Sequence, residues 1–287
     1  HFDFRTTIED AELRAYIPEF LETTYQFYRS ILRRSEESGE AATRMQTYLF
    51  ASRREWDSFT KRRFPKRHAL YRKITAGGYS EGDTCVVYNI GRAQTLSVLA
   101  HEGWHQYLSG HASEAVPAWL NEGLATYCES VDVRKGRTYF VPRHNTFRIN
   151  HLCNALTRND SLPLRELLNT DAGQVIDGQQ SSMTTAYYAQ VWALMVYLRH
   201  GDGGRHERGL RQLLDDIEGG EWNARSRSAR IASPDPSEIG AGESVFRAYI
   251  TDDVDAFEGL ERDLLLCCRP QSGEASPPGD LRQSAHE

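Results

Sequence analysis

The chain has 287 residues, of which 39% are hydrophobic and 26% are charged, so it is long and apolar enough to bury a proper core. Its formal net charge of −6 argues against a dedicated nucleic-acid-binding protein. No apolar run reaches about 18 residues, so we expect a soluble protein without a transmembrane helix. Its 5 cysteines include no Cys-x-x-Cys pair, which argues against a disulfide framework or a thiolate zinc site.

The first 92 residues are predicted to form an α/β part. Alternating or β-branched runs predict strands, and apolar residues at helical spacing predict helices. The adjacent glycines Gly77 and Gly78 indicate a turn. The expected strands are residues 1–7, 47–51, 70–75 and 84–89, and the expected helices are residues 10–34 and 55–64.

Helices are expected to dominate the rest of the chain. Residues 226–244 are rich in Ser, Arg, Pro and Gly, which predicts a loop, and residues 271–287 resemble a disordered tail. The sequence therefore predicts an α+β fold: a small mixed sheet within residues 1–92, then a mainly helical part, residues 93–270, both in one domain. The expected helices are residues 94–109, 115–129, 144–157, 164–169, 183–200, 205–218, 243–250 and 253–267.

A basic segment, residues 53–73, carries nine Lys or Arg residues against two acids. One interpretation is a patch that contacts RNA. The other is a helix whose aromatic residues, among them Trp56, Phe59 and Phe64, face the core while Arg and Lys cover a solvated face. The spacing of the aromatic residues favours the second interpretation.

The motif His101-Glu102-Gly103-Trp104-His105 has the HExxH spacing of zinc hydrolases. Positions i and i+4 of a helix lie on the same face, so His101 and His105 can each offer a ring nitrogen to one ion. Glu102 points about 100° away, where it can act on water rather than on the metal. Gly103 weakens a helix by about 1 kcal/mol relative to Ala, which indicates that another group approaches closely there. The alternative is a pair of surface histidines on an amphipathic helix.

A catalytic zinc ion takes three protein ligands, so the two histidines require a third group downstream. Glu122, in the segment Trp119–Ala125, follows His105 by 17 residues. This is enough chain for the first helix to end and for a second, starting near Pro117, to bring a carboxylate back. The alternative is that Glu122 is one more exposed helix carboxylate. We expect one Zn²⁺ ion on the two histidines and Glu122, although other divalent ions also accept this donor set.

The Trp-Leu-Asn-Glu-Gly-Leu-Ala segment that ends at Ala125 resembles the gluzincins, the zinc peptidases whose third ligand is Glu, including the aminopeptidase N and leukotriene-hydrolase branch. The segment that starts at Tyr188 resembles the later Tyr-containing helix of that branch, which implies that Tyr188 donates a hydrogen bond to the oxyanion. Tyr187 is the adjacent competitor, and a role as a core aromatic is the alternative for Tyr188. Glu129 has a spacing also found in the family, which implies that it accepts a hydrogen bond from a ligand histidine.

Overall, the chain most resembles the bacterial peptidase-MA-like domains of unknown function. They share the HExxH motif, the downstream Glu-Gly-Leu-Ala, a later Tyr-x-Gln helix and a segment that is resembled here by Leu162–Leu168. These matches span about residues 84–200. The resemblance implies a thermolysin-like α+β catalytic domain, in which an edge strand flanks the cleft and a helical lobe carries Glu122 and Tyr188.

The resemblance also implies that the strand before the metal-binding helix runs beside the substrate. Its open edge would hold an extended peptide near Val86, Val87 and Tyr88. Aminopeptidases of this type carry a Gly-x-Met-Glu-Asn motif whose Glu captures the free N-terminus of the substrate. This chain instead has Gly77-Gly78-Tyr79-Ser80-Glu81. Glu81 is therefore a candidate substrate contact, but aminopeptidase specificity is not implied.

The resulting hypothesis is a zinc-dependent peptidase in which His101, His105 and Glu122 hold the ion and Glu102 is general base and then general acid. Its partner would be a peptide or protein substrate, with no nucleic acid. Two alternatives remain: a catalytically inactive zinc- or peptide-binding module, and an RNA-associated protein that uses the basic segment. The first residue is His rather than Met, so we expect a processed mature chain, secreted or periplasmic, or a trimmed one.

Overall fold

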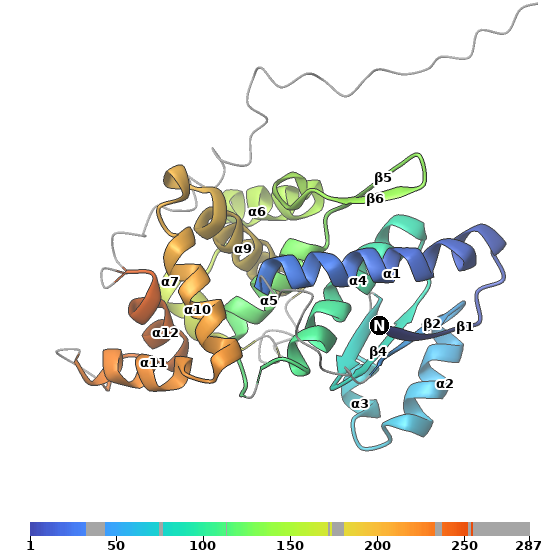
Figure 1. Ribbon diagram of the computed structural model, residues 1–287, viewed down its shortest axis with the longest axis horizontal. Helices are drawn as coiled ribbons and strands as arrows, with labels where there is room; N and C mark the ends of the chain where they lie inside the picture. The colour runs from blue at the N-terminus through green and yellow to red at the C-terminus, as the bar shows by residue number, and fades with distance from the viewer. Residues whose placement is uncertain are drawn as a thin grey trace, which may run out of the picture.

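A mixed sheet in the order β1-β2-β4-β3 occupies the N-terminal part of the protein (Figure 1). The structure, a computed structural model, describes residues 1–32, 44–74, 77–112, 114–171, 173, 181–232, 237–251 and 254. Strands β1, β2 and β4 are parallel, whereas β3 is antiparallel to β4 and forms an edge of the sheet. The strands are β1 (Phe2–Thr6), β2 (Met45–Phe50), β3 (Gly78–Glu81) and β4 (Thr84–Tyr88).

Different helices cover the two faces of this sheet (Figure 1). Successive residues of a strand point to opposite faces. On one face, Leu49 and Val87 enter the main core with α1 and α4. On the other face, Val86 and Tyr88 pack with α2 and α3 in a second, mostly aromatic cluster. The bounds are α1 (Ala11–Leu32), α2 (Arg53–Arg63), α3 (His68–Tyr71) and α4 (Arg92–Ser109).

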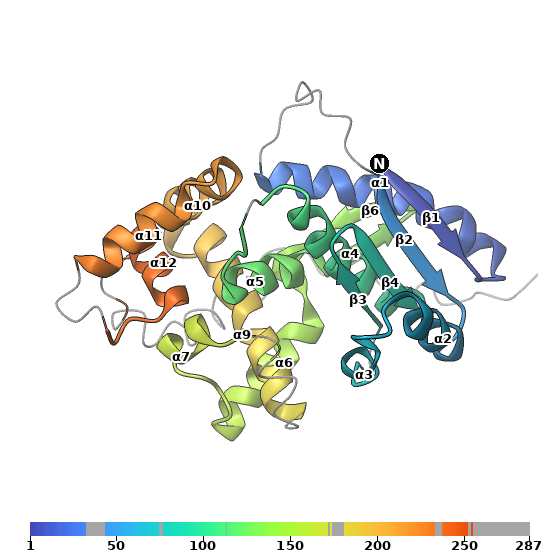
Figure 2. The same cartoon turned by 90° about the horizontal axis from the view of Figure 1, so that it is seen from below.

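A helical part lies to one side of the sheet, packed around α9 (Figure 2). Residues Val191 to Val196 of α9 are at most 1% exposed, because α5, α6, α7 and α10 all contact this helix. An antiparallel hairpin of β5 (Val131–Arg134) and β6 (Arg137–Phe140) connects α5 to α6. The helices are α5 (Ala118–Cys128), α6 (Thr146–Arg158), α7 (Leu164–Asn169), α9 (Ser181–His200), α10 (Glu207–Gly219), α11 (Trp222–Ile231) and α12 (Ala241–Tyr249), with 3₁₀ turns η1 (Pro142–His144) and η2 (Asp202–Gly204).

Two glycines allow α4 and α5 to pack closely against their neighbours. A Cβ atom at Gly103 would lie 2.6 Å from the hydroxyl oxygen of Tyr28, which donates a hydrogen bond to the Ala100 carbonyl oxygen at 2.6 Å. A Cβ atom at Gly123 would lie 3.0 Å from the Val191 carbonyl oxygen of α9. The close approach expected at Gly103 is therefore confirmed.

The strand expected at residues 70–75 is wrong. Helix α3 ends at Tyr71, and residues 75–76 lie outside the described residues. The Tyr71 ring stacks on that of Tyr79 in β3, with ring centres 3.8 Å apart. A short apolar run does not distinguish a strand from a helix, and here contacts with β3 decide between them.

The loop expected at residues 226–244 is wrong at both of its ends, whereas residues 237–240 within it are not helical. Helix α11 continues to Ile231 and α12 begins at Ala241. The hydroxyls of Ser226 and Ser244 lie 2.8 Å apart in a buried contact between these two helices. Tertiary packing thus overrides the low helical propensity of this Ser-rich segment.

The edge strand was misplaced by the sequence prediction. β4, which was expected to have an open edge, pairs with β2 on one side and with β3 on the other. β3 escaped detection because it has four residues and begins at Gly78, one of two glycines that predict a turn. The hairpin of β5 and β6 was not predicted either. The helix expected at residues 253–267 and the tail expected at 271–287 lie outside the described residues, except for Val254.

The structure confirms a mixed α+β fold with a small sheet and a predominance of helix. Among the described helices, none combines the length and the apolar character needed to cross a membrane.

Candidate metal centre

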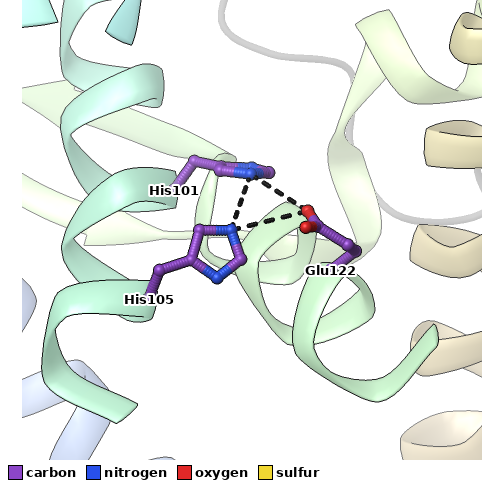
Figure 3. Close-up of side chains that lie close together, drawn as sticks. All are labelled: His101, His105 and Glu122. Carbon is purple, nitrogen blue, oxygen red and sulfur yellow. Dashed lines mark hydrogen bonds and ion pairs between the residues drawn. The ribbon is translucent and has the colours of Figure 1, made fainter. Parts of the chain in front are cut away.

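Helix α4 carries His101 and His105 one turn apart, with both rings on the same face (Figure 3). Their Nε2 atoms are 3.2 Å apart. Helix α5 packs against α4 and brings Glu122 to the same point. The Oε2 atom of Glu122 lies 3.4 Å from Nε2 of His101 and 3.5 Å from Nε2 of His105. The structure thus brings together the three side chains predicted as metal ligands.

The other nitrogen of each ring is held by an oxygen acceptor. His101 Nδ1 lies 2.8 Å from Oε1 of Glu129, and His105 Nδ1 lies 2.9 Å from Oδ1 of Asn121. Because these oxygens can only accept, each Nδ1 must carry the hydrogen. In the neutral rings, two Nε2 lone pairs then face each other beside a carboxylate oxygen. A positive charge at this point, either a metal ion or a proton on one ring, stabilises such an arrangement.

The spacing of these atoms fits a tetrahedral divalent ion. Zinc bonds of about 2.0–2.1 Å place tetrahedral ligand atoms about 3.3 Å apart. The observed separations are 3.2, 3.4 and 3.5 Å. Apart from the two imidazoles, Glu122 Oε2 is buried without a partner among the described residues. Two imidazoles and one carboxylate suit zinc, although they do not exclude other divalent ions.

The pKa values of the three groups show how strongly a positive charge is favoured here. Burial lowers the pKa of His101, but hydrogen bonds to Glu122 and Glu129 outweigh it and raise the pKa to about 10. Burial also lowers the pKa of His105, and the charge of Glu122 reverses this into a net rise. Burial raises the pKa of Glu122, whereas the two histidines lower it to a net value far below the usual range. The carboxylate therefore stays ionised.

Glu102 lies beside His101 on α4 and is half-buried near β3. Burial raises its pKa, against the opposing charges of His101 and His105. The Ser80 side chain of β3 lies beside this carboxylate and opposes the rise in its pKa. A carboxylate with a raised pKa next to a candidate metal site is suited to take up and return a proton.

Of the two adjacent tyrosines, only Tyr188 faces the centre. Its ring centre lies 6.0 Å from that of His101. Burial, followed by the charges of Glu122 and Glu102, raises its pKa well above the usual value, so the phenol remains a donor. Tyr187 is fully buried, and its hydroxyl lies 3.5 Å from the carbonyl oxygen of Thr170.

The side chains predicted to contact substrate do not gather at this centre. Val86, Val87 and Tyr88 belong to the inner strand β4 and are buried in the two cores. Glu81 lies on the α3 side of β3, where its carboxylate accepts hydrogen bonds from the Tyr71 hydroxyl and, at 2.8 Å, from Arg67. Its neighbour Ser80 faces α4 instead.

The edge strand that does flank the centre is β3. The N–H of Tyr88 donates to the Gly77 carbonyl oxygen at 2.9 Å, which fixes the alternation of this antiparallel pair. Tyr79 and Glu81 therefore point their backbone groups toward β4. Gly78 and Ser80 point theirs to the outer edge, next to Glu102.

Three further histidines of the chain, His111, His144 and His151, lie outside the cluster. His111, for example, bonds through Nδ1 to the Tyr107 carbonyl oxygen at 2.6 Å.

Sequence analysis missed Asn121, Asn145 and Arg148, of which the last two contact Glu129. The position of Asn121 in the sequence could have indicated its role, since it directly precedes the predicted ligand Glu122. The remaining two are brought to Glu129 by packing alone.

Residues 95–211 match the model of a family described as "Protein of unknown function (DUF1570)". This span starts in α4 and ends in α10, so it contains the three predicted ligands as well as Glu102, Glu129 and Tyr188. No curated protein and no solved structure was found to match the chain.

Proposed function

We propose that this protein is a zinc-dependent peptidase of the gluzincin type. The observation that carries the proposal is the convergence of His101, His105 and Glu122 at tetrahedral spacing, with Glu102 beside them. When bound, a zinc ion lowers the pKa of a coordinated water to about 7 and polarises a carbonyl group.

The acid and base chemistry is assigned to Glu102. Its carboxylate takes a proton from the attacking water and returns it to the leaving amine. The Ser80 side chain of β3 lies beside this carboxylate. Tyr188 keeps its proton and donates a hydrogen bond to the carbonyl oxygen as that oxygen gains negative charge.

The substrate is assigned to the outer edge of β3. The outward-pointing backbone groups of Gly78 and Ser80 would pair with an extended peptide and bring its scissile bond beside Glu102. An edge strand next to the HExxH helix is also the arrangement implied by a thermolysin-like fold, which supports that finer fold assignment.

The RNA-associated alternative has less support from the packing of the basic segment. Trp56 is fully buried and donates from Nε1 to the Val86 carbonyl oxygen at 3.1 Å. Tyr71 is 6% exposed. These rings are not free to stack on bases. RNA binding that weakens with salt and survives chelation would favour this alternative.

Metal dependence of peptide cleavage tests the proposal. The zinc-loaded protein is incubated with a peptide mixture, and products are identified by mass spectrometry. Cleavage is expected to stop when zinc is removed with dipicolinic acid and to return on addition of one equivalent of zinc. Isophthalic acid, which lacks the chelating ring nitrogen, serves as the control.

Two outcomes would contradict this expectation. Cleavage that persists after zinc removal would exclude the mechanism. A zinc-loaded protein that cleaves no peptide in the mixture would instead support the catalytically inactive binding module, for which neither Glu102 nor Tyr188 is required.

A further inference from the structure

Arg148 lies largely buried between Glu129 and Tyr188, beside the metal centre. Its side chain is 11% exposed and that of Glu129 is 7% exposed. Arg148 Nε donates to Glu129 Oε2 at 2.8 Å, and Nη2 donates to Oε1 at 2.6 Å. The guanidinium carbon also lies 5.3 Å from the centre of the Tyr188 ring. The side chain is therefore fixed on two sides.

The start of α6 is built around this contact. Asn145 caps the helix, because its Oδ1 accepts from the Arg148 backbone N–H at 3.1 Å. The same side chain donates from Nδ2 to Glu129 Oε2 at 3.3 Å. Helix α6 also packs along α9, the helix that carries Tyr188. The first turn of α6 thus reaches Glu129 through two side chains at once.

This contact determines how Glu129 faces the metal centre. The Oε1 atom that receives Nη2 of Arg148 also receives Nδ1 of His101, at 2.8 Å. A paired donation from a planar guanidinium fixes the plane of a carboxylate, which a single donor does not. With that plane fixed, Oε1 can approach only the Nδ1 side of His101, and Nε2 is left to face Glu122.

We propose that Arg148 is a positioning residue of the metal centre, which fixes the His101 ring through the carboxylate of Glu129. The inference rests on the proposed function, because it requires that His101 bind a metal ion. It assigns a role to a residue for which the sequence carries no signal.

The direction in which zinc affinity changes when Arg148 is removed distinguishes a positioning role from a purely electrostatic one. A guanidinium near the centre repels a divalent cation, so by charge alone its removal would strengthen zinc binding. Positioning predicts the opposite, a weaker site. Loss of a residue that orients a metal ligand typically weakens metal binding by about 10–100-fold.

The test compares zinc affinities of Arg148→Met, Arg148→Lys and wild type by competition with a chromophoric chelator, so that no peptide substrate is involved. Arg148→Met is expected to bind zinc about 10–100-fold more weakly. Arg148→Lys keeps the charge but loses the paired geometry, so it is also expected to bind more weakly than wild type. Arg158→Met removes an exposed arginine from the same helix and is expected to match wild type.

Loss of Arg148 leaves the buried Glu129 carboxylate without its charged partner, so Arg148→Met is accompanied by a variant without that defect. Glu129→Gln/Arg148→Met removes both charges and is compared with Glu129→Gln. If Arg148 acts through Glu129, the second substitution adds no further loss of zinc affinity. Circular dichroism establishes that each protein compared is folded, and the cobalt absorption spectrum reports changes in coordination.

The inference is overturned if Arg148→Lys binds zinc as tightly as wild type, or if the losses of the two single variants add in the double variant. Zinc binding by Arg148→Met that equals or exceeds wild type also overturns it. Each of these results leaves the proposed function intact. A wild-type protein that binds no zinc would instead remove the proposed function, and this inference with it.

Discussion

Replacement of Glu102 by Gln is expected to lower the kcat of peptide cleavage by about 10²–10⁴-fold. Glutamine preserves the shape of the side chain, but it cannot take a proton from water. Because Glu102 is not one of the three residues whose ligand atoms converge, zinc should remain bound. KM should change little, since the loss arises in the transition state. Steady-state kinetics on one identified peptide, with zinc content measured on the same sample, checks both expectations.

The matched control is Glu114→Gln, which removes an exposed carboxylate between α4 and α5. It is expected to cleave as wild type does. Equal kcat values for Glu102→Gln and wild type would exclude Glu102 as the proton acceptor. Loss of zinc together with activity in Glu102→Gln would assign this residue to metal binding instead.

Replacement of Glu122 by Ala is expected to weaken zinc binding by more than about 100-fold, because a lost ligand costs more than a lost orienting partner. Weaker zinc binding also reduces the thermal stabilisation that zinc gives to the folded protein. At about 1,000 times its Kd, zinc stabilises the folded wild type by about 4.1 kcal/mol, or roughly 8–16 °C in Tm for a chain of this size. At the same zinc concentration, the stabilisation of Glu122→Ala should fall to about 1.4 kcal/mol or less.

Calorimetric scans with and without zinc measure this difference. Glu166→Ala, which removes an exposed carboxylate from α7, is the control and should show the full zinc-dependent shift. An undiminished shift for Glu122→Ala would mean that zinc binds elsewhere or that Glu122 is not a ligand.

The ligands could be predicted from the sequence because their geometry is local. His101 and His105 are placed by the pitch of one helix, whatever the rest of the chain does. Glu122 needs only a turn and a second helix within a short stretch. The resemblance to gluzincins then pointed to Glu129 and Tyr188, and the structure places both beside His101.

The substrate edge could not be predicted in the same way, because strand order depends on pairing between distant segments. β4 looks like a good edge candidate by composition, yet its apolar residues are those of a strand buried on both faces. β3 is short and contains Gly78, so no periodic pattern marks it. Glu81 was misplaced because a shift of one residue in a strand turns a side chain to the opposite face.

Arg148 and Asn145 were missed for a related reason. They reach Glu129 because α6 folds back against α9, and nothing in their spacing from the HExxH motif indicates this contact. The structure supplies that information directly, and it turns an expected hydrogen bond between Glu129 and His101 into a connected set of contacts.

X-ray absorption at the zinc edge of the zinc-loaded protein tests the central claim most directly. The account predicts one zinc ion per chain with only nitrogen and oxygen neighbours at about 2.0–2.1 Å, including the scattering pattern of two imidazole rings. A zinc–sulfur distance of about 2.3 Å, or a shell without imidazole, would contradict it.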